Sequence, residues 1–513
     1  MTPDRRSPLP RRASSALSAL ALATALLAGC GSVPGSTSDE SIAPAQVRPE
    51  TARAWVDAWS ESGAESLSWT ACEDDADAEC GRLAVPRNWA DPADATIEIP
   101  VGRYPSTEDE APTLFVIQGG PGGSGTELVH DTVERVPSLR EGFTLVGFDP
   151  RGVWGLQGAD APLACPASAD GCTPSDELAR FASTTDVALD LEALRRTLGD
   201  TPLDAVAYSY GTYVGGVYAT LFPAQARRLV LDGAAPSIGF TALGTERQSI
   251  AFEESLDRFI DACLAGGLGP CPMSGDGAAA KAQLIELRSA LTAHPQQVPV
   301  DGIEITLDGA RMTAELLSAM YQPRSSWPGT ATWLSKAFAS ASLPAPPSAT
   351  PADGKSAAPR AAAPREEDAG DTAISGGFAH AVLCAMPEAT TPLDRADLEP
   401  LHGDDYFFIR DSANAAEDAA EALTCKTDRP AHLDPEITAS GSGRFLVTST
   451  TQDPATPFTD AATLADQLDA VLLGVEADGH TSVLSQSMCS TEAALAYLIC
   501  GELPADGTIC TDR

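Results

Sequence analysis

The sequence is poor in positive charge. Lysine and arginine together number 33 against 72 aspartate and glutamate residues, which gives a formal net charge of −39 over 513 residues. Phosphate backbones and anionic lipid surfaces repel such a polyanion, so we do not expect nucleic-acid binding. The apolar fraction of 43% and the seven tryptophans fit a folded chain of one large domain or two domains.

Long apolar runs are lacking after the first thirty residues. Four arginines precede a short apolar stretch, residues 13–28, which is typical of a secretory signal and too short to be interpreted first as a spanning helix. The sequence Leu27-Ala28-Gly29-Cys30 resembles a bacterial lipobox, in which the cysteine receives a lipid. We expect an extracytoplasmic lipoprotein that contacts the membrane only through Cys30. The alternative is ordinary cleavage near Ala28 and release.

The twelve cysteines include no C-x-x-C pair, and no histidine stands at ligand spacing from them. A zinc site is therefore disfavoured, and disulfides are expected in an exported chain. With Cys30 lipidated, eleven cysteines remain, and Cys500 is the one we expect to be unpaired. The pairs that the spacing suggests are Cys72–Cys80, Cys165–Cys172, Cys263–Cys271, Cys384–Cys425 and Cys489–Cys510.

Alternating strand and helix patterns predict a parallel sheet flanked by helices. Before residue 236, strands are expected at 113–118, 143–148, 204–208 and 228–232, and helices at 186–198 and 210–221. Asp186 is placed to cap the first of these helices. After a long helical and irregular stretch, strands are expected at 444–449 and 470–476, and helices at 459–468 and 491–498.

Ser209 stands between an expected strand and an expected helix, in Ala205-Val-Ala-Tyr-Ser-Tyr-Gly-Thr212. This pattern matches the nucleophile elbow G-x-S-x-G of α/β-hydrolases, with Ala207 in place of the first glycine. The sharp turn would raise Ser209 above the edge of the sheet. The backbone N–H of Tyr210, at the start of the helix, would then point at an oxyanion. We therefore expect Ser209 to be a catalytic nucleophile.

A glycine-rich segment, Gln118-Gly-Gly-Pro-Gly-Gly-Ser-Gly125, follows the first strong strand. Glycines let backbone amides approach a ligand, and α/β-hydrolases take the second oxyanion donor from the equivalent loop. Gly120 is our candidate for this donor, and Gly119 is the next choice. A phosphate-binding loop would need a following Gly-Lys-Ser/Thr, which is missing, and a plain turn is the remaining alternative.

The acid and base of such an enzyme follow the nucleophile in the order Ser, Asp, His. Asp453 follows the strand expected at 444–449, whereas Asp232, after an earlier strand, is an alternative that we interpret as structural. Of six histidines only His480 follows Asp453, and it too comes after a strand. His480 would accept the Ser209 proton and Asp453 would orient the ring. This chemistry requires no metal and no organic cofactor.

Together these motifs resemble the tripeptidyl aminopeptidase-like (TAP-like) branch of the exported actinobacterial α/β-hydrolases, which is related to prolyl aminopeptidases. The likeness extends from about residue 55 to Arg513. It is closest in Gln118-Gly-Gly-Pro-Gly, Phe148-Asp-Pro-Arg-Gly, Tyr208-Ser-Tyr-Gly-Thr, Asp453-Pro-Ala-Thr-Pro and Gly479-His480. The resemblance implies cleavage of short peptides from a free N-terminus beneath a helical lid. It also supports the cysteine pairs given above.

The sequence departs from this family at Ala207, Gln118, Trp154, Leu156 and Ala385-Met386. The last of these changes lie near the expected lid and entrance, so substrate choice is what the resemblance leaves open. We expect an aminopeptidase that releases di- or tripeptides. A carboxylesterase acting on small esters would use the same triad, and a non-catalytic binding lipoprotein is the third alternative. The oligomeric state has no signal in the sequence.

The expected architecture is an α/β-hydrolase fold with a mostly parallel central sheet and a long helical lid insertion. Its parts are a signal peptide (1–29), a flexible tether (30–50), the first part of the core (51–235), the lid (236–435) and the second part of the core (436–513). Within the lid, residues 340–371 are rich in alanine and proline and are expected to be disordered.

The lipobox predicts that Cys30→Ala shifts the protein from the membrane fraction to the soluble fraction, because the lipid is the expected anchor. Fractionation of cells that express either form, followed by immunoblotting, measures this. If the variant stays in the membrane fraction, the anchor is a different one.

Overall fold

The computed structural model describes residues 45–63, 67–72, 75–108, 111–153, 176–236, 242–300, 303–341, 381–382, 384–386, 406–408, 430–438 and 444–511. The expected signal peptide, residues 30–44 of the tether and residues 342–371 of the Ala/Pro-rich segment lie outside these ranges. So do Cys165, Cys172 and Cys425. In the described part of the chain, no helix is both long enough and apolar enough to cross a bilayer.

A central sheet, ten-stranded within the described residues, has the order β14-β13-β12-β8-β7-β5-β6-β4-β3-β2. The pairings from β14 to β6 are parallel, and those from β6 to β2 are antiparallel. The strands are β2 (Thr70–Ala71), β3 (Glu79–Pro86), β4 (Thr96–Tyr104), β5 (Thr113–Ile117), β6 (Thr144–Phe148), β7 (Leu203–Tyr208), β8 (Ala226–Asp232), β12 (Leu446–Gln452), β13 (Val471–Asp478) and β14 (Thr508–Cys510). The carboxyl ends of the parallel strands therefore share one edge of the sheet.

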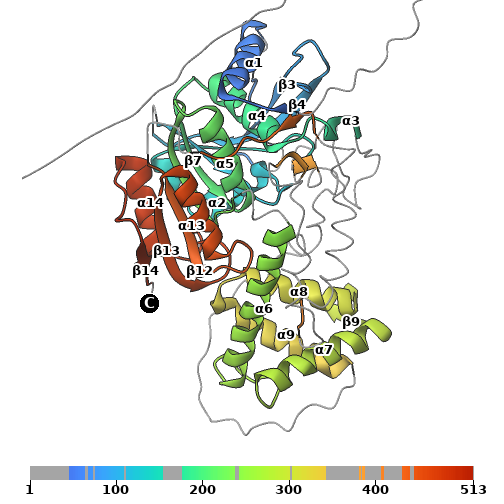
Figure 1. The fold of residues 1–513 in the computed structure, drawn as a ribbon. Coiled ribbons are helices and arrows are strands. Elements are labelled where there is room, and N and C mark those ends of the chain that lie inside the picture. Colours follow the sequence, from blue (N-terminus) through green and yellow to red (C-terminus); the bar gives the residue numbers. More distant parts are fainter. Residues whose placement is uncertain are drawn as a thin grey trace, which may run out of the picture. The chain divides into compact units, whose positions relative to one another are not determined.

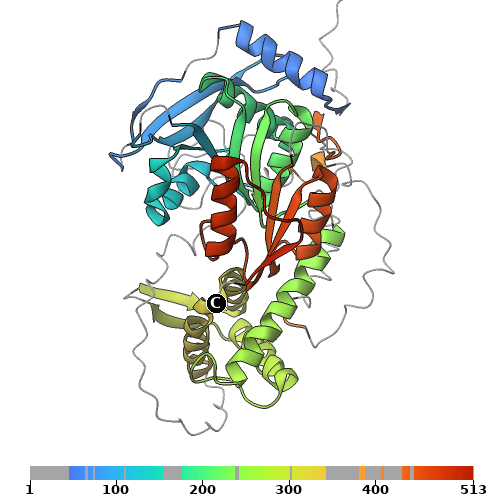
Figure 2. The same ribbon diagram turned by 90° about the vertical axis from the view of Figure 1, so that its left-hand side faces the viewer.

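Helices cover both faces of this sheet (Figures 1 and 2). One apolar cluster joins the sheet to α1 (Pro49–Glu61), α3 (Asp176–Ala179), α4 (Thr184–Thr197), α5 (Tyr210–Leu221) and α13 (Phe458–Leu468). A second cluster joins it to α2 (Gly125–Arg135), the 3-10 helix Pro137–Glu141 and α14 (Met488–Cys500). The side chains of the central strands are buried on both faces, as their continuous apolar runs require.

The predicted mostly parallel sheet is present. The strands and helices that the sequence predicts occur within a few residues of their predicted bounds. The antiparallel strands β2 to β4 were not predicted. The prediction for Asp186 was wrong, because Ser183 is the N-cap of α4 and Asp186 occupies the third helical position of a capping box. The Ser183 side chain accepts from the Asp186 amide, and the Asp186 carboxylate accepts from the Ser183 amide.

Two segments assigned to the tether and the lid pack on the hydrolase core. β1 (Ala45–Gln46) pairs in parallel with β11 (His432–Leu433). The Asp434 carboxylate then accepts a hydrogen bond from the Thr185 amide of α4, at 2.8 Å. Ala45–Gln46 of the expected tether thus pair with His432–Leu433 of the expected lid, and Asp434 contacts α4.

Between β8 and β12 lies a group of helices that we call the helical insertion, residues 242–341 (Figure 1). It contains α6 (Ala242–Leu264), α7 (Gly277–Ala293), α8 (Gly309–Tyr321), a 3-10 turn (Arg324–Ser326) and α9 (Trp327–Ser340). A hairpin of β9 (Gln296–Val300) and β10 (Ile303–Leu307) joins α7 to α8. These helices share an apolar cluster, which also includes Ala455 of the loop after β12 and Phe407.

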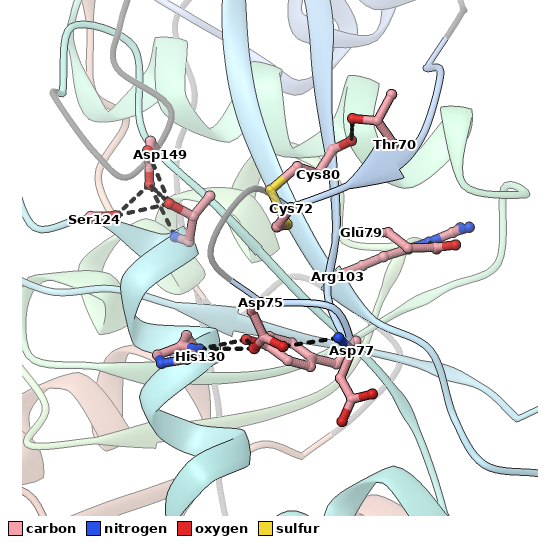
Figure 3. The surroundings of a disulfide bond; sticks show 12 residues. Thr70, Cys72, Asp75, Asp77, Glu79, Cys80, Arg103, Ser124, His130 and Asp149 are labelled. Atoms are coloured by element: carbon pink, nitrogen blue, oxygen red, sulfur yellow. Dashed lines mark hydrogen bonds and ion pairs between the residues drawn. A yellow bond between two sulfur atoms is a disulfide. The ribbon is translucent and has the colours of Figure 1, made fainter.

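Three of the suggested disulfides are formed in the structure: Cys72–Cys80, Cys263–Cys271 and Cys489–Cys510. Cys384 is also disulfide-bonded, and its suggested partner Cys425 lies outside the described residues. Cys500 is free and exposed. Figure 3 shows the Cys72–Cys80 loop, from which Asp75 reaches Tyr104 and His130 of α2. The disulfide thus closes this loop at the antiparallel edge of the sheet, and Asp75 links the loop to the helix that follows the glycine-rich loop.

A buried ion pair fastens the Asp-Pro-Arg-Gly loop after β6 to α4. The Arg151 guanidinium donates to Asp190 at 2.7 and 2.5 Å, and neither side chain has any exposed surface. Arg151 also donates to the carbonyl oxygens of Arg87 and Phe181, both at 2.8 Å, and the Trp89 indole donates to Asp190. The pair is therefore fully hydrogen-bonded in a site without water access, where removal of one partner leaves an unpaired charge.

We predict that Arg151→Leu lowers the free energy of unfolding by about 3–5 kcal/mol, because Asp190 is left buried and uncompensated. Urea denaturation followed by tryptophan fluorescence measures the change. Arg82→Leu is the matched control, since the Arg82–Glu98 pair is long, at 3.5 Å, and partly exposed. Its loss should cost about 0–1 kcal/mol. Equal effects of the two substitutions would contradict the assignment.

Candidate active site

The predicted catalytic segments all lie at the shared carboxyl edge of the parallel strands. The glycine-rich loop follows β5, and Ser209 directly follows β7. Asp453 directly follows β12, and His480 lies two residues after β13. Because β12 and β13 are neighbours and β8 separates β12 from β7, the acid and base are placed beside each other and one strand away from the nucleophile.

Ser209 has the backbone conformation of a nucleophile elbow. Its φ of 55° and ψ of −128° lie in a region that costs a non-glycine residue about 1–3 kcal/mol, so the surroundings must impose it. The Ser209 amide donates to the Asp232 carbonyl at 3.0 Å, and the Thr212 hydroxyl donates to the Ser209 carbonyl at 2.6 Å. Ser209 is half-buried between the buried residues Tyr208 and Tyr210, which leaves its side chain presented to a reactant.

The glycine-rich loop passes directly over Ser209. A β-carbon placed on Gly119 would lie 2.7 Å from the Ser209 β-carbon and 3.3 Å from its Oγ, so only glycine permits this approach. The Gly119 amide donates to Gln118 Oε1 at 2.8 Å. No acceptor for the Gly120 amide is found among the described residues. This arrangement favours Gly120 over Gly119 as an oxyanion donor. The Tyr210 amide, in the first turn of α5, is the other candidate.

Asp149 fixes the far end of the glycine-rich loop, a role that sequence reasoning missed. Its buried carboxylate accepts from the Ser124 hydroxyl at 2.7 Å and from the amide and hydroxyl of Thr126, both at 3.0 Å (Figure 3). Burial raises the pKa of Asp149 despite these hydrogen bonds. Ser124 also caps α2 by accepting from the Glu127 amide. The loop is therefore held between β5 and a capped helix.

Asp453 and His480 form a hydrogen-bonded pair. His480 Nδ1 lies 2.8 Å from Asp453 Oδ2 and 3.0 Å from Oδ1. The carboxylate is oriented in turn by the amides of Ala455 and Thr456, which both donate to Oδ1 at 2.9 Å. The Asp453 side chain has no exposed surface and that of His480 is one-tenth exposed. His480 Nε2 is buried and has no hydrogen-bond partner within the described part of the chain, which leaves it available for proton transfer.

The end of β8 places the His480 ring near the nucleophile. A β-carbon on Gly233 would lie 2.7 Å from His480 Cε1, so the ring rests on the backbone of this glycine. The preceding residue, Asp232, accepts the hydrogen bond from the Ser209 amide. Ser209 thus contacts Asp232, the last residue of β8, and the His480 ring lies against Gly233, the residue that follows. Of the predicted triad, the Asp453–His480 hydrogen bond is formed, and the role of Ser209 beside it stays a prediction.

Asp232, the alternative acid, has a different role. Its carboxylate accepts from the Thr448 hydroxyl at 2.6 Å and from the amides of Ser482 and Val483 at 2.6 and 2.8 Å. Burial raises its pKa. These hydrogen bonds join β8 to β12 and to the segment that follows His480. The geometry supports the structural interpretation of Asp232 and leaves the acid role to Asp453.

The electrostatics of the site favour a protonatable His480 ring. Burial disfavours its charged form, but the negative charges of Asp453 and Asp232 outweigh burial and raise the His480 pKa above its ordinary value of 6.5. Tyr321 packs edge-on against the ring, with the centroids 5.5 Å apart. Burial and the Asp453 charge raise the pKa of Tyr321 to about 12, so its phenol stays neutral near neutral pH.

Comparison with known proteins agrees with this geometry. The family described as alpha/beta hydrolase fold matches residues 112–270, and the family described as TAP-like protein matches residues 413–510. Serine protease Hip1 of Mycobacterium tuberculosis is 27% identical over 494 residues, covering 87% of this chain and 91% of the relative. Tripeptidyl aminopeptidase of Streptomyces lividans is 28% identical, covering 99% and 98%. Carboxylesterase B of M. tuberculosis is 26% identical, covering 87% and 90%.

The raised pKa of His480 predicts the acid limb of the pH profile. The neutral ring is the base, so reactivity falls as the pH drops through a midpoint above 6.5. Asp453→Asn removes the charge that raises this pKa. The midpoint should therefore move to lower pH, and the maximal rate should fall by about 10⁴-fold. The second-order rate of fluorophosphonate labelling, measured from pH 5 to 9, gives both values. A wild-type midpoint below 6.5 would contradict the assigned base.

Proposed function

We propose that this chain, a serine hydrolase with an α/β-hydrolase domain and a TAP-like domain, is a lipid-anchored extracytoplasmic aminopeptidase that releases di- or tripeptides from peptide N-termini. The observation that carries the hydrolase part is the arrangement of Ser209 in a strained elbow beside the Asp453–His480 pair. The anchor on Cys30 rests on the lipobox and the signal-like segment before it.

The mechanism follows from the positions of these groups. His480 Nε2 accepts the Ser209 proton as Oγ attacks the carbonyl carbon of the substrate, and Asp453 stabilises the imidazolium that forms. The amides of Tyr210 and Gly120 bind the oxyanion, and a single donor of this kind contributes about 10²–10³ to the rate. His480 then protonates the departing amine, and a water molecule activated by the same ring hydrolyses the acyl-enzyme.

Two relatives support a peptide substrate. One is named a serine protease and the other a tripeptidyl aminopeptidase, and the second aligns with this chain over nearly the whole length of both proteins. The alignment therefore includes the helical insertion as well as the core. In this chain the insertion contacts the catalytic base through Tyr321.

A carboxylesterase is the second candidate. A relative of similar length is named carboxylesterase B, and the same triad would attack a small ester without any group to hold a substrate amine. The third alternative, a binding lipoprotein, has less support. A protein that only binds a ligand has no need to hold Ser209 in a costly backbone conformation beside a hydrogen-bonded acid and base.

The substrate is tested by turnover of free-amine tripeptide amides, their N-acetylated forms and short-chain esters by the purified protein. We expect cleavage of the free-amine peptides, loss of cleavage on acetylation and no turnover by Ser209→Ala, because the nucleophile is removed. Turnover of esters alone would make the protein a carboxylesterase. Lack of turnover of every substrate would favour a non-catalytic binding protein.

A further inference from the structure

Both catalytic loops are held by the helical insertion as well as by the sheet. The acid loop follows β12 and the base loop follows β13, and each receives side chains or backbone contacts from α6 or from the end of α8. The residues that make each of these contacts are more than 120 positions apart in the sequence, so no local motif predicts the contacts. They concern the residues next to Asp453 and His480.

The end of α8 docks directly on the base loop. The His480 amide donates to the carbonyl of Tyr321, the last residue of α8, at 2.8 Å. Gly479 has a φ of +101°, and a β-carbon on it would lie 2.8 Å from the Gln322 carbonyl oxygen. Only glycine permits this conformation and this approach. The backbone of the base is therefore fixed against the backbone of the insertion.

Arg258 of α6 contacts the last residues of β12 and β13, the paired strands that lead into the two catalytic loops, with one guanidinium group. Its Nε donates to Asp478 Oδ1 at 2.6 Å, and its Nη2 donates to the Gln452 carbonyl at 3.4 Å. Gln452 immediately precedes Asp453, and Asp478 is two residues before His480. Asp478 is nearly buried, at 8% exposure, and Arg258 is one-quarter exposed. The charge-assisted bond between them is thus partly shielded from water.

Other contacts hold the acid loop and the same carboxylate. Gln248 of α6 donates to the Ala455 carbonyl at 2.6 Å, and Arg247 forms an ion pair with the buried Asp460 at 2.8 Å. Arg324, after α8, lies 3.6 Å from the second oxygen of Asp478. These cations come from the insertion and the anions come from the core. In a chain with a net charge of −39, this pairing neutralises carboxylates close to the site.

We propose that Arg258 is a positioning residue for the triad, which sets the acid loop and the base loop relative to each other by bridging Gln452 and Asp478. The triad is then complete only when α6 is docked, and the helical insertion is a working part of the catalytic centre. Displacement of a catalytic group by about 1 Å lowers the rate by about 10²-fold, so a bridge between the two loops has a measurable effect.

The test compares Arg258→Met with Arg258→Lys and with Arg311→Met by the second-order rate of fluorophosphonate labelling. We expect Arg258→Met to label about 10–100-fold more slowly, because the bridge is lost. Arg258→Lys should lie between this variant and wild type, since an ammonium group reaches Asp478 but lacks the second arm. Arg311 of α8 pairs with Glu315 on the insertion surface, so its variant should label at the wild-type rate.

Three further readouts separate positioning from folding and from substrate binding. The thermal midpoint and the KM for the best substrate should change little in Arg258→Met, while kcat falls with the labelling rate. Asp478→Asn keeps the shape of the side chain and removes its charge, so it serves if Arg258→Met fails to fold. Combining the two substitutions should slow labelling by less than the product of the two single effects, because both remove the Arg258–Asp478 bond.

The outcomes distinguish this inference from the proposed function on which it rests. Labelling of folded Arg258→Met or Asp478→Asn at the wild-type rate overturns the role of Arg258 and leaves the triad intact. A wild-type protein that does not react with the probe overturns both proposals. A protein that reacts with the probe but cleaves only esters corrects the substrate class alone, and the labelling rates of the Arg258 variants still decide the role of Arg258.

Discussion

Asp232 contacts all three of the segments that carry the proposed triad. Its carbonyl accepts the amide of Ser209, and its carboxylate accepts from Thr448 on the strand that leads to Asp453. The same carboxylate accepts from the amides of Ser482 and Val483, which follow the catalytic histidine. A buried carboxylate is costly unless its oxygens are hydrogen-bonded, and here every one of these bonds also fixes a catalytic segment. The nucleophile, the acid and the base are therefore positioned through one residue that takes no part in the chemistry.

The remaining constraints act from outside the sheet. The glycine-rich loop can pass over Ser209 only because Gly119 has no side chain, and Asp149 holds the start of the following helix. The insertion contacts the base loop through Tyr321 and the end of β13 through the Arg258–Asp478 pair. The strained conformation of Ser209 persists because it is held from several directions at once. A site built in this way is preorganised, which is what stabilisation of a developing oxyanion requires.

Much of this site could be predicted from the sequence because its signals are local or follow chain order. The elbow around Ser209 is a contiguous motif, and His480 is the only histidine after Asp453. The antiparallel strands β2 to β4 were missed although β2–β3 and β3–β4 pair sequence neighbours; only the pairing of β4 with β6, which adds them to the sheet, joins residues distant in sequence. The cap of α4 was misplaced by three residues because Ser183 and Asp186 are both good capping residues and only the backbone separates their roles. The hydrogen bond between Arg258 and Asp478 joins residues 220 positions apart, so no periodic pattern in the sequence predicts it.

The central claim is that Ser209 is the nucleophile of a working acyl-transfer site. Peptide mapping by mass spectrometry after reaction with a fluorophosphonate tests it most directly, because the adduct marks the serine that the neighbouring base has activated. We predict a single adduct, on the peptide that contains Ser209, and no adduct in the Asp453→Asn variant on the same timescale. An adduct on a different serine, or unchanged labelling of Ser209 without Asp453, would contradict it.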